Sequence, residues 1–162
     1  MAIVNSAGRW LRLIAPPLSA LLMGACAHGE ASLSDAVRSE ESETVNVVLK
    51  EWYILPNERT AHESNVTFKV VNQGRMDHEF LVIKTDLPIH ALPVHEKGLN
   101  EKKAGKKMGE IEDIRPGETR EITIYMPSGN YVLFCNKVET LNHETISHYR
   151  RGMRVAFTVR HD

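Results

Sequence analysis

The sequence predicts an all-β domain, a Greek-key β-sandwich or barrel of about seven to eight strands, behind an N-terminal export segment. From residue 45 onward, hydrophobic residues recur at every second position, with many β-branched and aromatic residues among them. Strong turn formers separate these runs at residues 72–74, 115–118 and 127–130. No amphipathic segment of helix length lies between the early runs, which argues against a parallel α/β sheet.

The composition is that of a folded protein and excludes two classes. Of the 162 residues, 42% are hydrophobic and 25% are charged, as expected for a globular domain. Lys and Arg total 20 against 21 for Asp and Glu, so the chain lacks the basic excess of a nucleic-acid-binding protein. The two cysteines are too few for a disulfide-framework scaffold.

Residues 1–26 are typical of a signal peptide. Basic residues precede the apolar run 13–25, which is too short for a membrane-spanning helix and contains two prolines. The end of the run, Leu22-Met23-Gly24-Ala25-Cys26, resembles a bacterial lipoprotein lipobox, and we favour this interpretation. Cys26 would then be lipidated and would attach the protein to the membrane. The alternative is cleavage by ordinary signal peptidase at Ala25-Cys26-Ala27, which leaves a soluble protein.

Both export routes predict a periplasmic or extracytoplasmic protein. Residues 27–43 are small, polar and charged without an apolar period, so we expect a flexible tether there. The folded domain is predicted to span residues 44–162.

Seven runs are predicted as strands, and one segment does not fit the pattern. The segment 85–108 contains prolines, glycines and five lysines, and predicts a long Lys-rich, solvated loop with a short helix. A partner-docking surface is the alternative for this segment. The expected strands are 45–50 leading into 52–54, 66–71, 78–83, 110–114, 121–126, 130–135 and 155–159.

Candidate chemistry gathers around Cys135. If Cys26 belongs to the export signal, Cys135 is the single thiol of the mature domain and has no internal disulfide partner. His78 opens the third predicted strand, and His148 and Met153 follow Cys135. Thiolate, imidazole and thioether ligands favour copper, and two His, one Cys and a weak Met form a trigonal electron-transfer site.

At these positions the sequence resembles the cupredoxins, the blue (type 1) copper proteins. The resemblance covers roughly residues 45–159 and implies one copper ion per chain, held by His78, Cys135, His148 and Met153. The segments that carry it are 72–80, 115–117, 129–136 and 148–153.

Two departures from the family pattern affect this assignment. The Cys-to-His step is short in most of the family, whereas residues 136–147 separate Cys135 from His148 here, so His143 is a rival ligand. We favour His148 because it keeps the family spacing to Met153. Glu79 follows His78 where many members have an Asn that ties the two ligand loops together, and Asn136 is a candidate to replace that bond.

The expected function is single-electron transfer between periplasmic or membrane redox partners, such as a cytochrome or a membrane oxidoreductase. Arg150 and Arg151 could steer an acidic partner, or could be ordinary solvated charges. The alternative function is extracytoplasmic copper carriage or homeostasis. We do not expect an enzyme, because the sequence has no second His-rich copper cluster and no evident catalytic constellation.

Overall fold

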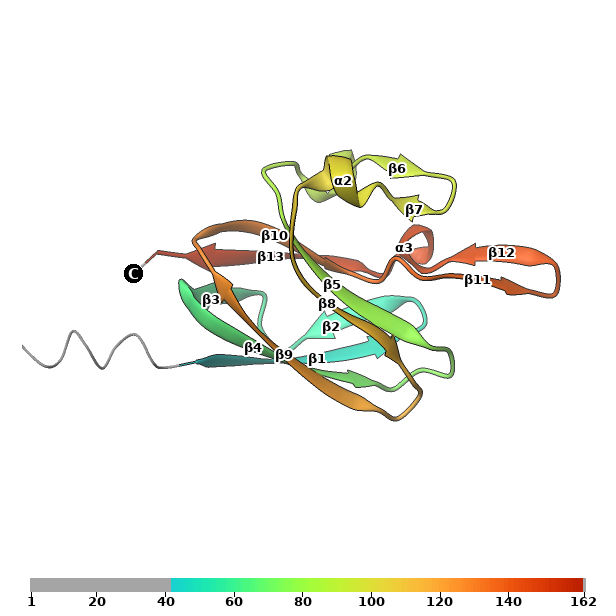
Figure 1. Cartoon of the computed structure of the whole chain (residues 1–162), viewed down its shortest axis with the longest axis horizontal. Coiled ribbons are helices and arrows are strands. Elements are labelled where there is room, and N and C mark those ends of the chain that lie inside the picture. The colour runs from blue at the N-terminus through green and yellow to red at the C-terminus, as the bar shows by residue number, and fades with distance from the viewer. Residues whose placement is uncertain (1–41, 162) are drawn as a thin grey trace, which may run out of the picture. The chain divides into compact units, whose positions relative to one another are not determined.

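In the computed structural model, which describes residues 42–161, the chain forms two β-sheets packed face to face (Figure 1). The predicted sandwich is confirmed, and its sheets do not close into a barrel. One sheet has the order β2 (Tyr53–Pro56), β1 (Glu43–Lys50), β4 (Ser64–Asn72), β9 (Thr119–Met126). The other has the order β3 (Thr60–His62), β13 (Arg154–Arg160), β10 (Gly129–Phe134), β5 (His78–Lys84), β8 (Lys106–Ile114).

The N-terminal predictions fall almost entirely on residues that are not described. The expected signal peptide, including Cys26, and the expected tether up to residue 41 lie outside the described residues. The domain boundary expected at residue 44 lies beside Glu43, where β1 begins. Within residues 42–161, no helix is long and apolar enough to cross a membrane.

The core between the sheets follows from the two-residue period of the strands. In β1, Val45, Val47 and Leu49 are buried while their neighbours face outward. Phe68 of β4 meets Phe80 of β5 across the core, with ring centroids 5.3 Å apart. Burial of these apolar faces stabilises the sandwich and fixes the register of its strands.

The Lys-rich segment covers the outer face of the second sheet. It contains η1 (Ile89–Ala91), β6 (Val94–His95), β7 (Gly98–Leu99) and α2 (Glu101–Ala104), so the expected short helix is present. The segment is less solvated than predicted, because Leu92, Leu99 and Ala104 are buried in a second cluster with apolar residues of β5 and β10. Those two strands are apolar on both faces, so the segment shields their outer face from water.

The residues inserted between Cys135 and His148 form a β-hairpin. β11 (Val138–Leu141) pairs with β12 (Glu144–Ser147), and the hairpin projects from one end of the sandwich (Figure 1). Asn142 and His143 make the turn with positive φ angles of 51° and 67°. Two such residues are the requirement of a type I′ hairpin turn, and Asn tolerates that conformation well. The short helix α3 (His148–Arg151) follows directly.

Candidate metal centre

Three neighbouring strands bring the predicted ligand residues to one end of the second sheet. His78 is the first residue of β5, and Cys135 directly follows β10. Met153 directly precedes β13, and His148 begins α3 a few residues earlier. Because β10 is antiparallel to both β5 and β13, its end lies beside the starts of the other two.

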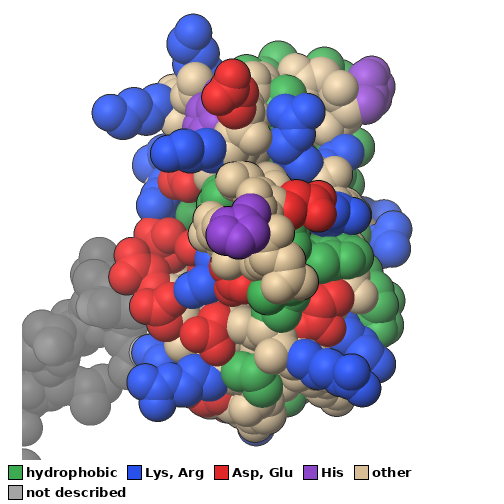
Figure 2. Space-filling view, turned by 90° about the vertical axis from the view of Figure 1, so that its right-hand side faces the viewer, with side chains coloured by type: hydrophobic (Ala, Val, Ile, Leu, Met, Phe, Trp, Pro, Cys, Tyr) green, Lys and Arg blue, Asp and Glu red, His purple; other side chains and the backbone are tan. Residues whose placement is uncertain are grey.

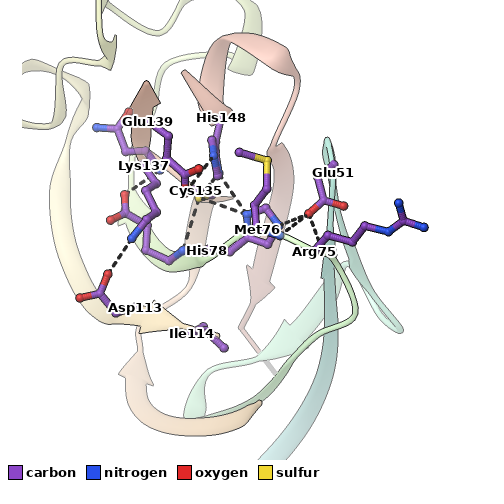
Figure 3. Close-up of polar contacts among 12 residues, drawn as sticks. Glu51, Arg75, Met76, His78, Asp113, Ile114, Cys135, Lys137, Glu139 and His148 are labelled. Atoms are coloured by element: carbon purple, nitrogen blue, oxygen red, sulfur yellow. Dashed lines mark hydrogen bonds and ion pairs between the residues drawn. The ribbon is translucent and has the colours of Figure 1, made fainter. Parts of the chain in front are cut away.

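The side chains of His78, Cys135 and His148 point toward one another (Figure 3). The two imidazole Nδ1 atoms are 3.0 Å apart, and the Cys135 Sγ lies 3.3 Å from His148 Nδ1 and 4.0 Å from His78 Nδ1. All three residues have 0% of their surface exposed. The result is a closed group of two nitrogen donors and one sulfur donor inside the protein.

Met153 is held next to this group by the backbone. Its N–H donates to the carbonyl of His148 at 3.1 Å, and its carbonyl accepts from the Cys135 N–H at 3.0 Å. Its side chain is fully buried in the same hydrophobic cluster as Cys135. Gly152 precedes it with a φ of 119°, which a residue with a side chain rarely adopts, so the turn before Met153 depends on glycine.

A hydrogen-bond link joins the two ligand segments, and the candidate Asn136 takes part in it through its backbone N–H. The Asn136 N–H donates to Glu79 Oε1 at 2.8 Å, so the carboxyl after His78 makes the link. The Glu79 N–H in turn donates to the Cys135 Sγ at 3.4 Å. The Asn136 side chain instead binds the backbone of Leu99 and the carboxylate of Glu101, which fastens the covering segment to the site.

Burial determines the protonation of the three side chains. Desolvation, followed by repulsion from His78, lowers the pKa of His148 to about 4. Desolvation also lowers the pKa of His78, and it raises the pKa of the Cys135 thiol to about 12. These shifts favour neutral imidazoles and a protonated thiol when no metal is bound. Neutral imidazoles are the ligating form, and metal binding would release the thiol proton.

The outer edges of both imidazoles face carboxylates. The buried Nε2 atoms of His78 and His148 have no hydrogen-bond partner among the described residues. His78 Nε2 lies 3.4 Å from Glu51 Oε1, and His148 Nε2 lies 3.9 Å from Glu139 Oε1 of β11 (Figure 3). The Glu51 carboxylate is itself fixed by the N–H groups of the segment before His78. Such groups orient imidazole ligands and tune the metal they hold.

The turn between β1 and β2 contributes two of the neighbours of the site, and sequence reasoning missed both. This turn carries Glu51 and Trp52, and the Trp52 ring packs edge-on against the His148 ring with centroids 5.1 Å apart. Glu139 was missed as well, because the inserted residues were not expected to form a strand. The local sequence carried no signal for either contact, because Trp52 lies in a run that was expected to be a strand.

The rival residue His143 lies away from the group. It occupies the exposed turn of the β11–β12 hairpin, whereas His148 lies at the base of that hairpin. Of the candidates, the structure thus brings together His78, Cys135 and His148, with Met153 buried beside them.

Solved structures of blue copper proteins share this architecture. Reduced auracyanin from the photosynthetic bacterium Roseiflexus castenholzii is 18% identical, with 74% of this chain and 98% of that chain covered and a TM-score of 0.50. Auracyanin B is 18% identical over 73% and 88% of the two chains, with a TM-score of 0.52. Auracyanin A of Chloroflexus aurantiacus, described as a "blue" copper protein, is 16% identical over 74% and 100%, with a TM-score of 0.51.

The chain has the cupredoxin fold. The resemblance to cupredoxins seen in the sequence is confirmed at the level of fold. No protein-family model and no curated protein sequence matches the chain.

Proposed function

We propose that the protein binds one copper ion through His78 Nδ1, Cys135 Sγ and His148 Nδ1, and that it carries single electrons. The observation that carries this proposal is the buried group of three donor atoms within 4.8 Å of one another. Met153 is the proposed weak axial ligand. Two imidazoles, a thiolate and a distant thioether suit both Cu(I) and Cu(II), so bound copper would exchange one electron with little rearrangement.

Burial of the donors supports an electron carrier over an enzyme. A substrate would have to reach the ion through residues that have no exposed surface. The same burial supports retention of copper over rapid metal exchange, because the Trp52 ring and the hairpin residue Glu139 lie against the histidines. A copper-carrying function remains the second candidate, and it predicts rapid loss of copper to a chelator.

The proposed setting is extracytoplasmic. The sequence of residues 1–26, which is typical of a signal peptide, supports this location, with Cys26 as the proposed lipid anchor and a redox protein as the proposed partner. Figure 2 faces the end of the molecule from which the hairpin projects, and acidic and basic side chains are interspersed there. A face of mixed charge gives weak overall steering, so short-range contacts on this face would select the partner.

Visible and electron paramagnetic resonance spectra of the Cu(II)-loaded chain test the ligand assignment. We expect a type 1 spectrum in the wild type and in His143→Ala, and its loss in His148→Ala. His143→Ala is the matched control because it removes an imidazole from the same hairpin segment without touching the donor group. A wild-type protein without intense thiolate-to-copper absorption would refute the proposed site, and loss of the spectrum in His143→Ala alone would move the ligand.

A further inference from the structure

The imidazole of His148 does not reach the protein surface. Its residue has no exposed area, and the Nε2 edge that points away from Cys135 is itself buried. An electron entering through this ring therefore has to cross another group first. The hairpin and the β1–β2 turn provide the groups that cover it, Glu139 and Trp52.

Trp52 is the covering group with a π-system. Its ring lies against His148 at a centroid distance of 5.1 Å and an interplanar angle of 76°. Among residues 42–161, the ring contacts of the two histidines are with each other and with Trp52. The indole is only partly buried, so one continuous side chain extends from the imidazole to the solvent.

The outer side of Trp52 is held in place from α3. The Arg151 guanidinium lies over the indole, 5.8 Å from its centroid, and donates to Glu144 of the hairpin at 2.9 Å. The indole thus contacts both an imidazole and a guanidinium of α3. A fixed ring in contact with His148 offers a constant path, whereas a mobile surface side chain would not.

We propose that Trp52 is the electron port of this protein, in place of an exposed histidine edge. This inference rests on the proposed copper site. In the reductive direction, an outer-sphere one-electron donor loses one electron and Cu(II) becomes Cu(I). The electron crosses the indole and the His148 imidazole, and no bond is made or broken and no proton is transferred. The indole is left unchanged after each transfer.

Electron-transfer kinetics of the full, copper-loaded chain test the port. Reduction by hexaammineruthenium(II) is followed by stopped-flow absorbance, and self-exchange is measured by nuclear magnetic resonance. We expect Trp52→Leu to slow both processes several-fold, and Trp52→Phe, which keeps a ring, to slow them less. Tyr53→Leu is the matched control, because Tyr53 is the adjacent aromatic residue, 45% exposed, and makes no ring contact with the histidines.

The type 1 spectrum and the reduction potential separate a port from a structural role. We expect both to be unchanged in the Trp52 variants that transfer electrons slowly. Unchanged electron-transfer rates in Trp52→Leu would overturn the inference. Slower transfer that is explained by a shifted reduction potential or an altered spectrum would overturn it as well. A wild-type chain without a type 1 spectrum would instead refute the copper site, so the two failures are distinguishable.

Fluorescence gives a second readout that needs no electron transfer to a partner. The sequence has two tryptophans, Trp10 and Trp52, so Trp52 is the sole indole emitter in a Trp10→Phe chain. We expect Cu(II) to quench this emission at one equivalent and redox-inactive Zn(II) to leave it largely intact. Emission that is insensitive to Cu(II) in a protein with the type 1 spectrum would refute the contact between Trp52 and the site.

Discussion

Glu79 combines a structural hydrogen bond with an unfavourable charge, and this leads to a pH-dependent prediction. Its carboxylate accepts from the Asn136 N–H and so joins the two ligand segments. Burial, assisted by the nearby carboxylates Glu110 and Glu101, raises its pKa from 4.5 to about 7 despite that bond. The folded state therefore binds the proton more tightly than the unfolded state. The contribution of Glu79 to stability is greatest below pH 4.5 and is lost as the pH rises from 4.5 through 7.

The magnitude follows from the difference between the two pKa values. A tenfold change in proton affinity is worth about 1.4 kcal/mol, so full ionisation costs the fold about 3 kcal/mol, or about 2 kcal/mol allowing for partial solvent access. Glu79→Gln removes this cost and keeps an oxygen that can accept from Asn136. We expect the substitution to be near neutral at pH 5 and to stabilise the metal-free protein by about 2 kcal/mol at pH 8.5.

Urea denaturation of the metal-free chain at the two pH values measures this difference. A gain of about 2 kcal/mol raises the midpoint by about 1 M urea at pH 8.5. Glu112→Gln, on an exposed position of β8, is the control for the change in net charge. The same stability change at both pH values, or a loss of stability at pH 8.5, would refute the reasoning.

Three further predictions concern the scaffold. Hydrogen bonds from a backbone N–H and a tyrosine hydroxyl lower the pKa of Glu63 to about 2, so its stabilising effect is present above pH 4.5 and is lost toward pH 2. Glu63→Gln should therefore lower the melting temperature at pH 6 more than at pH 2.5, and an equal effect at both would contradict this. Leu99→Ala, in the segment covering the second sheet, should reduce the free energy of unfolding by about 2–5 kcal/mol, whereas Leu87→Ala, at a 43% exposed site, should change it by less than about 1 kcal/mol. A solvated, loosely attached segment would give equal, small effects in denaturant titrations. Gly105→Ala places its Cβ 2.1 Å from a backbone carbonyl and should prevent stable folding, while Gly117→Ala, with nothing within 4 Å, should cost about 1 kcal/mol for its positive φ. Circular dichroism melts of both glycine variants test this prediction. A similar decrease in melting temperature in the two variants would contradict it.

The alternating strands were predictable because burial of one face imposes a two-residue period. Val45, Val47 and Leu49 show that period in the sequence and point into the core of the sandwich. The meeting of His78 with Cys135 and His148 was foreseeable from their places at strand ends combined with the family spacing. Their role as copper ligands stays a proposal, which the spectra described above would test.

Contacts made across the fold were not predictable from local pattern. Glu51 and Trp52 read as the approach to a strand, and only the tight β1–β2 turn brings them to the histidines. We predicted that the Lys-rich segment is solvated because of its lysines, and we gave too little weight to its apolar residues. One of these, Leu99, is buried against the sheet. The hairpin turn at Asn142 and His143 was missed because this residue pair is a weaker signal than the usual Asn-Gly.

The turn that carries Glu51 and Trp52 and the helix that begins at His148 lie almost a hundred residues apart in the chain. The donor group is therefore enclosed only after early and late segments have come together, which is a slow, long-range event in folding. An incomplete chain that ends before His148 lacks one of the three donors of this group. If the proposed site holds a metal, we expect retention of that metal to require both segments, so that a truncation removing either the β1–β2 turn or the segment from His148 onward would abolish it.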